Sequence, residues 1–100
     1  MNQKKSIKIL EALAQDTRMN IYKLLIQENK DGLSAGTIAE ILEIPPATLS
    51  FHLTHMENAD LLKSHRKGRS IMYSAKQKAI KNLIEFLTEN SFKKREEERA

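Results

Sequence analysis

Two short segments on either side of a Pro-Pro pair constrain the fold of this chain more than any other feature. Ser34 can cap a helix that runs to about Leu42. Pro46 can occupy the first turn of a second helix, where its missing N–H costs nothing. Because residues 43–45 leave only a tight connection, residues 34–59 are typical of a helix-turn-helix. The alternative is a generic helical hairpin.

The second helix has an outward face unlike that of an ordinary surface helix. Leu49, Leu53 and Met56 fall on one side at helical spacing and predict a buried stripe. A solvated face normally carries Lys and Glu, but here it carries Ala47, Phe51, Thr54 and His55, flanked by Thr48 and Ser50. Small groups and hydroxyls let a helix approach base edges, and a ring can contact a thymine methyl. The face therefore favours contact with a DNA major groove; alternatively, Phe51 packs against a neighbouring element.

A basic hairpin is predicted directly after this helix. Residues 62–74 form two extended arms around Lys67-Gly68, where glycine supplies the positive φ of a hairpin turn. The tip has no neighbouring acid in the sequence and carries Arg66, Lys67 and Arg69. Because a two-stranded ribbon is marginal alone, we expect it to pack on the helices through Leu62, Ile71 and Tyr73. A helix-turn-helix followed by such a hairpin is a winged helix; the alternative is a solvated surface hairpin.

The distribution of charge supports a basic face in the middle of the chain. The net charge of the 100 residues is +4. Residues 45–82 carry seven Lys or Arg against two Asp or Glu, whereas residues 1–44 carry six of each and residues 83–100 carry four against five. The surplus lies beside the second helix, as expected of a surface that binds phosphates.

Helices are also predicted at both ends of the chain. Apolar spacing indicates helices over residues 5–14 and 76–90, and a central one from about Thr17 to Glu28 with Asp16 as its N-cap. The expected fold is mainly α with a small β-hairpin: about five helices plus a two-stranded wing, in one domain over residues 1–92. Residues 93–100 are expected to be a charged tail, either a frayed helical extension or solvated.

The terminal helices have more apolar surface than a domain of this size readily covers. Two protomers that pack these helices together would cover it. We call the second helix of the helix-turn-helix the reading helix; two-fold symmetry would place two reading helices one DNA turn apart, about 34–36 Å. The alternative is that the stripes pack only within their own chain. The candidate interface residues are Ile7, Leu10, Ile80, Leu83, Ile84 and Leu87.

Several functions are disfavoured by what the sequence lacks. No apolar run approaches the roughly 20 residues that span a bilayer, and no signal-peptide pattern opens the chain, so we expect a cytoplasmic protein. Cysteine is absent. His52 and His55 are three residues apart, but zinc needs three or four protein ligands and Glu57 completes no recognised spacing. No nucleophile motif or glycine-rich phosphate loop appears, so we expect no enzyme, no cofactor and no metal site.

Taken in order, these motifs resemble the ArsR-type winged-helix repressors of bacteria, and most closely the arsenic-regulator branch. The resemblance covers roughly residues 7–90 and rests on ALAQDTR at 12–18, PATLSFHL at 46–53, ADLL at 59–62, RKGRSIMY at 66–73 and FLTEN at 86–90. It implies a homodimer that binds an operator and represses transcription until an inducer releases it. It also implies that the residues at or near DNA are Ala47, Thr48, Ser50, Phe51, His52 and His55, with Arg66, Lys67 and Arg69 on phosphates or in a minor groove.

The sequence departs from this family at the inducer site. Many relatives bind metals through cysteines, or through His and acidic side chains on the last helix. Here Ser91 and Phe92 follow FLTEN, and residues 76–90 contain no His or Asp. A hydroxyl and a ring cannot replace thiolates for arsenic, so we expect no metal sensing of the known kinds. The alternative function is a winged-helix adaptor that binds an acidic protein partner without sequence-specific DNA binding.

Overall fold

The chain folds into five helices and a small antiparallel sheet. The computed structural model describes the backbone of residues 1–99 and the side chains of residues 1–89. The elements are α1 (Gln3–Leu13), α2 (Asp16–Ile26), β1 (Leu33–Ser34), α3 (Ala35–Leu42), α4 (Pro46–Asn58), β2 (Leu62–Lys67), β3 (Ser70–Ala75) and α5 (Gln77–Arg99). The predicted winged helix is therefore confirmed, with three strands in place of two.

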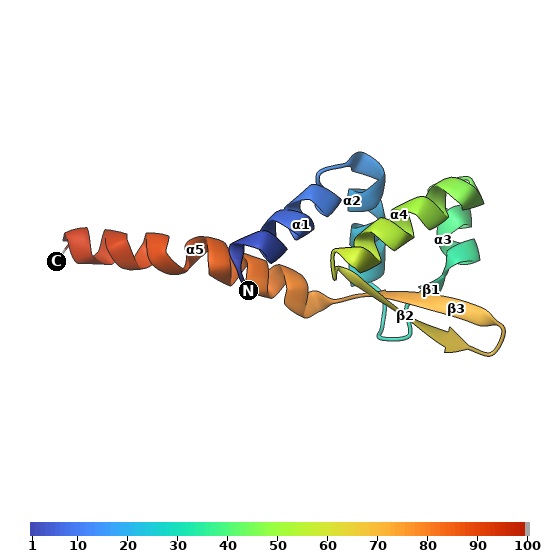
Figure 1. Ribbon diagram of the computed structural model, residues 1–100. Coiled ribbons are helices and arrows are strands. Elements are labelled where there is room, and N and C mark those ends of the chain that lie inside the picture. The colour runs from blue at the N-terminus through green and yellow to red at the C-terminus, as the bar shows by residue number, and fades with distance from the viewer. Residues whose placement is uncertain (100) are drawn as a thin grey trace.

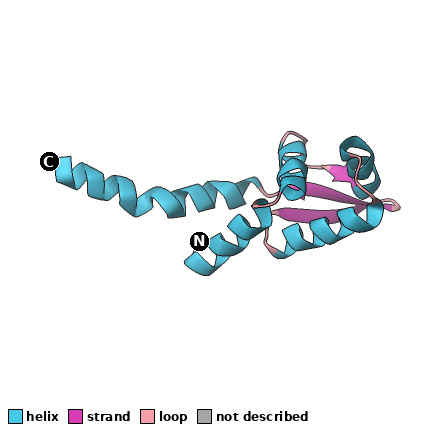
Figure 2. Cartoon of the chain, turned by 90° about the horizontal axis from the view of Figure 1, so that it is seen from above, coloured by secondary structure: helices cyan, strands magenta, loops and turns pink. Residues whose placement is uncertain are grey.

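The arrangement separates a compact body from one projecting helix. Helices α2, α3 and α4 gather beside the hairpin of β2 and β3, while α1 lies against the first part of α5 (Figure 1). The remainder of α5 leaves the body in both views (Figures 1 and 2). The molecule consequently measures 58 × 23 × 21 Å along its principal axes. Within residues 1–99, no helix combines the length and apolar character that crossing a bilayer requires.

The third strand, β1, is the element that the sequence analysis missed. It pairs antiparallel with β3, with Leu33 opposite Tyr73 and Ser34 opposite Met72, so the sheet order is β1-β3-β2. Two residues are too few to show the alternation by which a strand is recognised. Gly32 lets this strand approach β3: its φ is +73°, and a Cβ there would lie 1.9 Å from the carbonyl oxygen of Tyr73.

The core lies between the inner faces of the helices and the base of the hairpin. The predicted stripe of α4 is confirmed, since Leu49, Leu53 and Met56 are fully buried. Leu62 is also buried and Tyr73 is half-buried, as expected. Ile71 is 40% exposed, so its predicted packing is wrong. It lies on the same face of β3 as Tyr73 but two residues nearer the tip, beyond the helices.

The helix ends agree with the sequence analysis in part. Ser34 caps α3 as predicted: its Oγ accepts a hydrogen bond from the N–H of Thr37 at 3.2 Å. Gln15, and not Asp16, caps α2, because its side-chain oxygen accepts from the N–H of Arg18 at 2.8 Å. The backbone of α5 is helical to Arg99, well past the predicted end. The prediction that residues 93–100 form a charged, solvated tail concerns side chains that lie outside the described residues.

Candidate nucleic-acid interface

The turn between α3 and α4 sets the direction of the exposed helix. Glu43 has a left-handed backbone, φ 53°, which ends α3. The N–H of Ile44 then donates to the carbonyl of Ala39 at 3.0 Å, and the Pro45 carbonyl accepts from the N–H of Leu49 at 2.9 Å. These bonds close a three-residue turn, so α4 begins at Pro46 with a fixed orientation against α3.

The outward face of α4 consists of small groups, hydroxyls and one aromatic ring. Phe51 is the most exposed large apolar side chain of this helix, at 64%. Its ring centroid lies 6.4 Å from that of His55. The predicted DNA-contact residues that share this exposed face are Ala47, Thr48, Ser50, Phe51 and His55. Their contact with DNA stays a prediction, but the structure places them together on one accessible surface.

His52 does not belong to that surface. It is only 8% exposed, and its Nδ1 lies 3.2 Å from Nη1 of Arg18. A guanidinium has no lone pair to accept with, so Nδ1 accepts and the ring proton sits on Nε2. Burial lowers the pKa of His52 below its ordinary value of 6.5, and the charges of Arg18 and His55 lower it further. The placement of His52 at the DNA is therefore corrected: it is a neutral side chain behind the exposed face.

Arg18 is a structural residue to which the sequence analysis assigned no role. Its Nε donates to the carbonyl of Ala12 at 2.6 Å, and its Nη2 lies 3.5 Å from the carbonyl of Glu11. These are the unsatisfied carbonyls at the C-terminal end of α1. Together with its contact to His52, Arg18 therefore joins α1, α2 and α4. A cation in the first turn of a central, apolar helix is a signal that could have indicated this.

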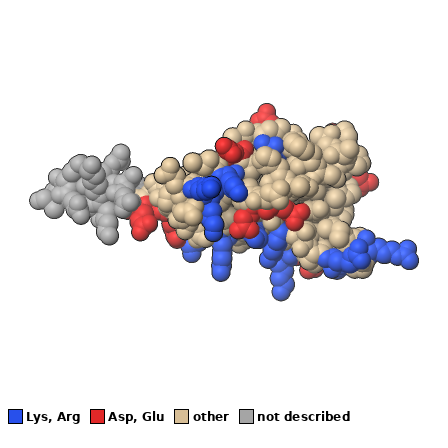
Figure 3. Space-filling model, viewed as in Figure 1, with Lys and Arg blue, Asp and Glu red and all other residues tan. Residues whose placement is uncertain are grey.

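The wing presents its cations at the far end of the sheet. Arg66, Lys67 and Arg69 are exposed around a turn in which Gly68 has φ 63°, as predicted. Figure 3 shows this cationic end at the lower right. The sequence places no acid next to the tip, but the fold brings one there: Lys67 Nζ pairs with Asp31 Oδ2 at 3.3 Å. Within the described side chains, the two arginines make no ion pair, so their charge is available to a ligand.

The terminal helices expose four of the six candidate interface residues. Ile7 and Leu10 on α1, and Ile84 and Leu87 on α5, are each more than two-fifths exposed. The other two face the core of their own chain: Leu83 is buried and Ile80 packs against the same cluster. The structure thus divides the predicted interface: Ile80 and Leu83 are on the core-facing side of α5, and the other four residues are exposed on α1 and α5.

The described part of the chain holds no candidate metal site. No three His, Asp or Glu side chains among the described residues gather where they could hold a metal ion. Ser91 and Phe92, from which the sequence analysis predicts the absence of metal sensing, lie outside the described side chains. The geometry therefore defines a class: a winged helix-turn-helix in which the outward face of α4 and a basic wing are exposed.

Comparisons with known proteins agree with this class. A family described as "Helix-turn-helix domain" matches residues 13–65. The chain is 32% identical over 80 residues to the transcriptional repressor SdpR of Bacillus subtilis (strain 168), an alignment that spans 79% of this chain and 84% of that protein. It is 33% identical over 78 residues to a cadmium resistance transcriptional regulatory protein CadC homolog of Staphylococcus aureus. That alignment spans 78% of this chain but only 63% of the relative.

A solved structure shows the same fold. The ArsR-like transcriptional regulator from Rhodococcus sp. RHA1 superposes with a TM-score of 0.81 at 22% identity, covering 93% of this chain and 85% of that one. The chain belongs to the ArsR-type family of winged helix-turn-helix transcriptional regulators. This is a family of DNA-binding regulators and not of enzymes.

Proposed function

We propose that this protein is a dimeric repressor that binds a palindromic operator. The observation that carries the proposal is Phe51, a large apolar ring 64% exposed in the centre of an uncharged helix face. Exposing such a ring to water is unfavourable, and a thymine methyl in the major groove is a suitable partner for it. Ala47, Thr48, Ser50 and His55 surround it and supply close approach and hydrogen-bonding groups.

The wing supplies the contacts that do not depend on sequence. Arg66 and Arg69 carry charge that no acid neutralises within the described side chains, and they stand at the end of a paired hairpin. Arginines in this position suit phosphate oxygens or a narrow minor groove. Lys67 contributes less in this proposal, because Asp31 already holds its ammonium.

A second copy of the chain is the proposed cover for the exposed apolar residues of α1 and α5. Ile7 and Leu10 on α1, and Ile84 and Leu87 on α5, are exposed on two helices that are in contact, which supports a shared interface in this proposal. Two-fold pairing through this region would give two reading helices and an operator with two-fold symmetry. Repression is supported by the likeness to SdpR, whose name states that role. Such a regulator works in the bacterial cytoplasm, where the chromosome is.

Selection of bound sequences from a random duplex pool tests the proposal. We expect a palindrome whose half-sites are separated by one helical turn, about 10 base pairs. Binding to it should be at least about 10³-fold tighter than to random duplex. Phe51→Ala should change the preferred bases. Arg69→Ala should reduce the slope of log affinity against log salt by about one, without changing the preference.

Lys81→Ala is the matched control for Arg69→Ala. It removes one exposed positive charge from α5, away from the wing, and should leave the salt slope unchanged. If all duplexes bind equally and Phe51→Ala has no effect on preference, the alternative function applies: an adaptor whose basic hairpin binds an acidic protein.

A further inference from the structure

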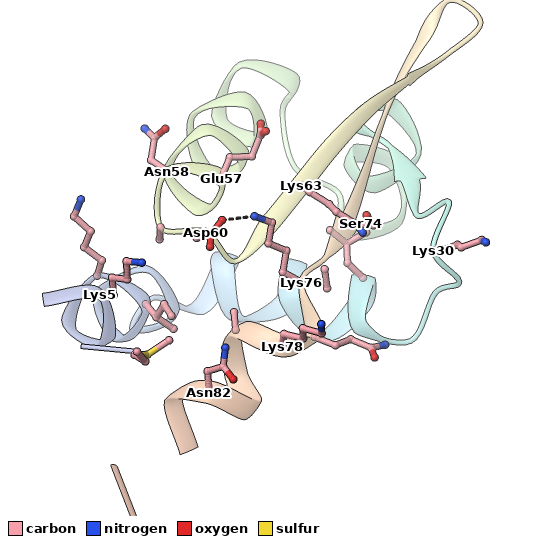
Figure 4. A pocket seen from close by; sticks show the side chains of 18 of the residues that line it. Lys5, Lys30, Glu57, Asn58, Asp60, Lys63, Ser74, Lys76, Lys78 and Asn82 are labelled. Carbon is pink, nitrogen blue, oxygen red and sulfur yellow. Dashed lines mark hydrogen bonds and ion pairs between the residues drawn. The ribbon is translucent and has the colours of Figure 1, made fainter. Parts of the chain in front are cut away.

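A groove of about 970 Å³ opens at the base of the wing. Its walls come from α1, the C-terminal ends of α2 and α4, the bases of β2 and β3, and the first turns of α5 (Figure 4). The volume is that of a pocket for a small organic ligand, since such pockets measure about 300–1,000 Å³. None of the residues assigned above to DNA contact lines it.

The rim of the groove is strongly basic. Three acidic residues line it, against six lysines, which are Lys5, Lys8, Lys30, Lys63, Lys76 and Lys78. Asp60 pairs with Lys76, and Glu57 keeps its charge while it accepts a hydrogen bond from Ser64 Oγ at 2.9 Å, so the lining has a formal surplus of three positive charges. Lys63 and Lys78 form no ion pair within the described side chains, and Figure 4 shows both at the groove. A site with this surplus attracts an anion.

The inner part of the groove is apolar, with one unsatisfied hydroxyl. Ile9, Leu25 and Ala79 contribute buried apolar surface to its lining. Ser74, on β3, lines the same groove at 3% exposure, and its Oγ has no hydrogen-bond partner. Buried polar groups in proteins are almost always paired, so this hydroxyl on the groove wall is expected to pair with a ligand atom or with a water molecule. A hydroxyl of this kind fixes orientation in a mostly apolar pocket.

From these three features we infer that the groove binds an organic anion with an apolar body, such as an aromatic or aliphatic acid. The lysines of the rim, above all Lys63 and Lys78, hold its acidic group. The apolar lining covers its body, and Ser74 Oγ pairs with a polar atom. A metal ion does not suit this surplus of ammonium groups.

The position of the groove gives the ligand a regulatory role, and this part rests on the proposed function. The same cavity touches the end of the reading helix at Asn58, the inner strand of the wing at Ser74, and α5 at Asn82. A ligand there contacts both the proposed DNA-binding elements and α5. Its affinity therefore depends on how these elements are placed relative to each other. By linkage, the operator and the anion must then change each other's affinity by the same factor.

The probe 1-anilinonaphthalene-8-sulfonate, an aromatic anion with an apolar body, tests the site on the DNA-free protein. We expect saturable fluorescence enhancement, and much weaker binding of N-phenyl-1-naphthylamine, which has the same rings without the sulfonate. The double variant Lys63→Ala, Lys78→Ala should bind the probe at least about fivefold more weakly. Ser74→Ala should also weaken binding without loss of folding stability, because its hydroxyl has no partner to lose.

Lys23→Ala, Lys81→Ala is the matched control, since both lysines are exposed and neither lines the groove. Probe binding in this variant should equal that of the wild type. Equal binding by the groove variant and the wild type would place the probe on the exposed apolar helices and overturn the inference. Equal losses in both lysine variants would show nonspecific attraction by charge, with the same consequence.

Operator binding, measured separately, distinguishes the two proposals. A protein that binds the operator but not the probe refutes only the groove, and one that binds the probe but no operator refutes only the proposed function. Saturating probe should change operator affinity at least about threefold in the wild type and not in the groove variant; no change refutes the regulatory role. If the groove variant instead loses operator affinity together with salt slope, its lysines contact DNA phosphates and the inference fails.

Discussion

Arg18 and His52 meet behind the exposed face of α4, although they are 34 residues apart in the sequence. Nη1 of Arg18 lies 3.2 Å from Nδ1 of His52, and Nε of the same guanidinium donates to the carbonyl of Ala12 at 2.6 Å. One side chain thus connects the end of α1 with the middle of the reading helix. Since α1 belongs to the proposed dimer surface, this contact would couple dimer assembly to DNA binding by α4.

Removal of Arg18 should therefore destabilise the fold and weaken operator binding. Arg18→Ala leaves the Ala12 carbonyl and His52 Nδ1 without their donor, at an expected cost of about 2 kcal/mol in the free energy of unfolding. Urea denaturation measures it. Arg18→Lys keeps the charge but cannot donate in the same fork, so it should recover only part of the loss. Wild-type stability in Arg18→Ala would show that the contact contributes nothing.

The stability of the protein should fall as the pH decreases below about 6.5. The pKa of His52 is lowered by burial first, and then by Arg18 and His55, whereas the unfolded chain titrates near 6.5. Between the lowered folded-state pKa and 6.5 the unfolded chain binds more protons, so the free energy of unfolding decreases there with falling pH. Above 6.5 the full contribution of neutral His52 is present.

His52→Asn isolates this effect. Its side-chain oxygen can accept from Arg18 in place of Nδ1, but the amide does not titrate. Urea denaturation at pH 7.5 and 5.5 should show a smaller decrease for His52→Asn than for the wild type. An identical decrease in both proteins would assign the pH dependence to other groups.

Two glycines with similar backbones should respond differently to a methyl group. Gly32 and Gly68 have φ of +73° and +63°, so alanine at either costs about 1–2 kcal/mol from conformation alone. At Gly32 the added Cβ would also lie 1.9 Å from the carbonyl oxygen of Tyr73, whereas nothing lies within 4 Å at Gly68. Gly32→Ala should therefore lose about 3 kcal/mol or more, with separation of β1 from β3. Thermal unfolding of the two variants, compared directly, checks the difference; equal losses would contradict it.

Tyr22→Phe should be neutral or stabilising. The hydroxyl of Tyr22 is buried without a hydrogen-bond partner, and burial raises the pKa of this phenol above 10.0. Removing an unpaired hydroxyl avoids its desolvation cost, so a gain of up to about 1 kcal/mol is expected. Differential scanning calorimetry measures it. A clear loss of stability would mean that the hydroxyl has a partner in solution.

Ile84→Glu should dissociate the proposed dimer. Ile84 is 55% exposed on α5, and a carboxylate there would be buried unpaired if two copies pack through this face. Ile41→Glu is the matched control, because Ile41 is 53% exposed but lies on α3. Sedimentation velocity should show a monomer for the first variant and a dimer for the second. A dimer in both would place the interface elsewhere.

Local features of the sequence were enough for the helix-turn-helix and the wing. The stripe of Leu49, Leu53 and Met56 has helical spacing, and the residue type of Gly68 alone indicates the turn of the wing. β1 was missed because two residues show no alternation. The contact of Arg18 with His52 was missed for a different reason: the cation in the first turn of α2 indicates a structural role for Arg18, but no local pattern identifies His52, on another helix, as its partner.

Contacts in space also divided residues that the sequence treats alike. Leu83 and Ile84 are adjacent members of one apolar stripe, but Leu83 is 5% exposed and Ile84 is 55% exposed. Which of them faces the core depends on how α5 lies against α1. Asp31 likewise reaches Lys67 only because β1 brings the preceding turn to the edge of the hairpin.

Ser34 belongs to two structures at once: it pairs with Met72 of the wing and caps α3 of the reading unit. Because hydrogen bonds also close the turn between α3 and α4, the wing and the reading helix are held at a fixed separation in the free protein. Little entropy is lost in aligning them, and a duplex whose groove dimensions differ from that separation has to deform to fit. Selectivity would then extend to base pairs that no side chain touches.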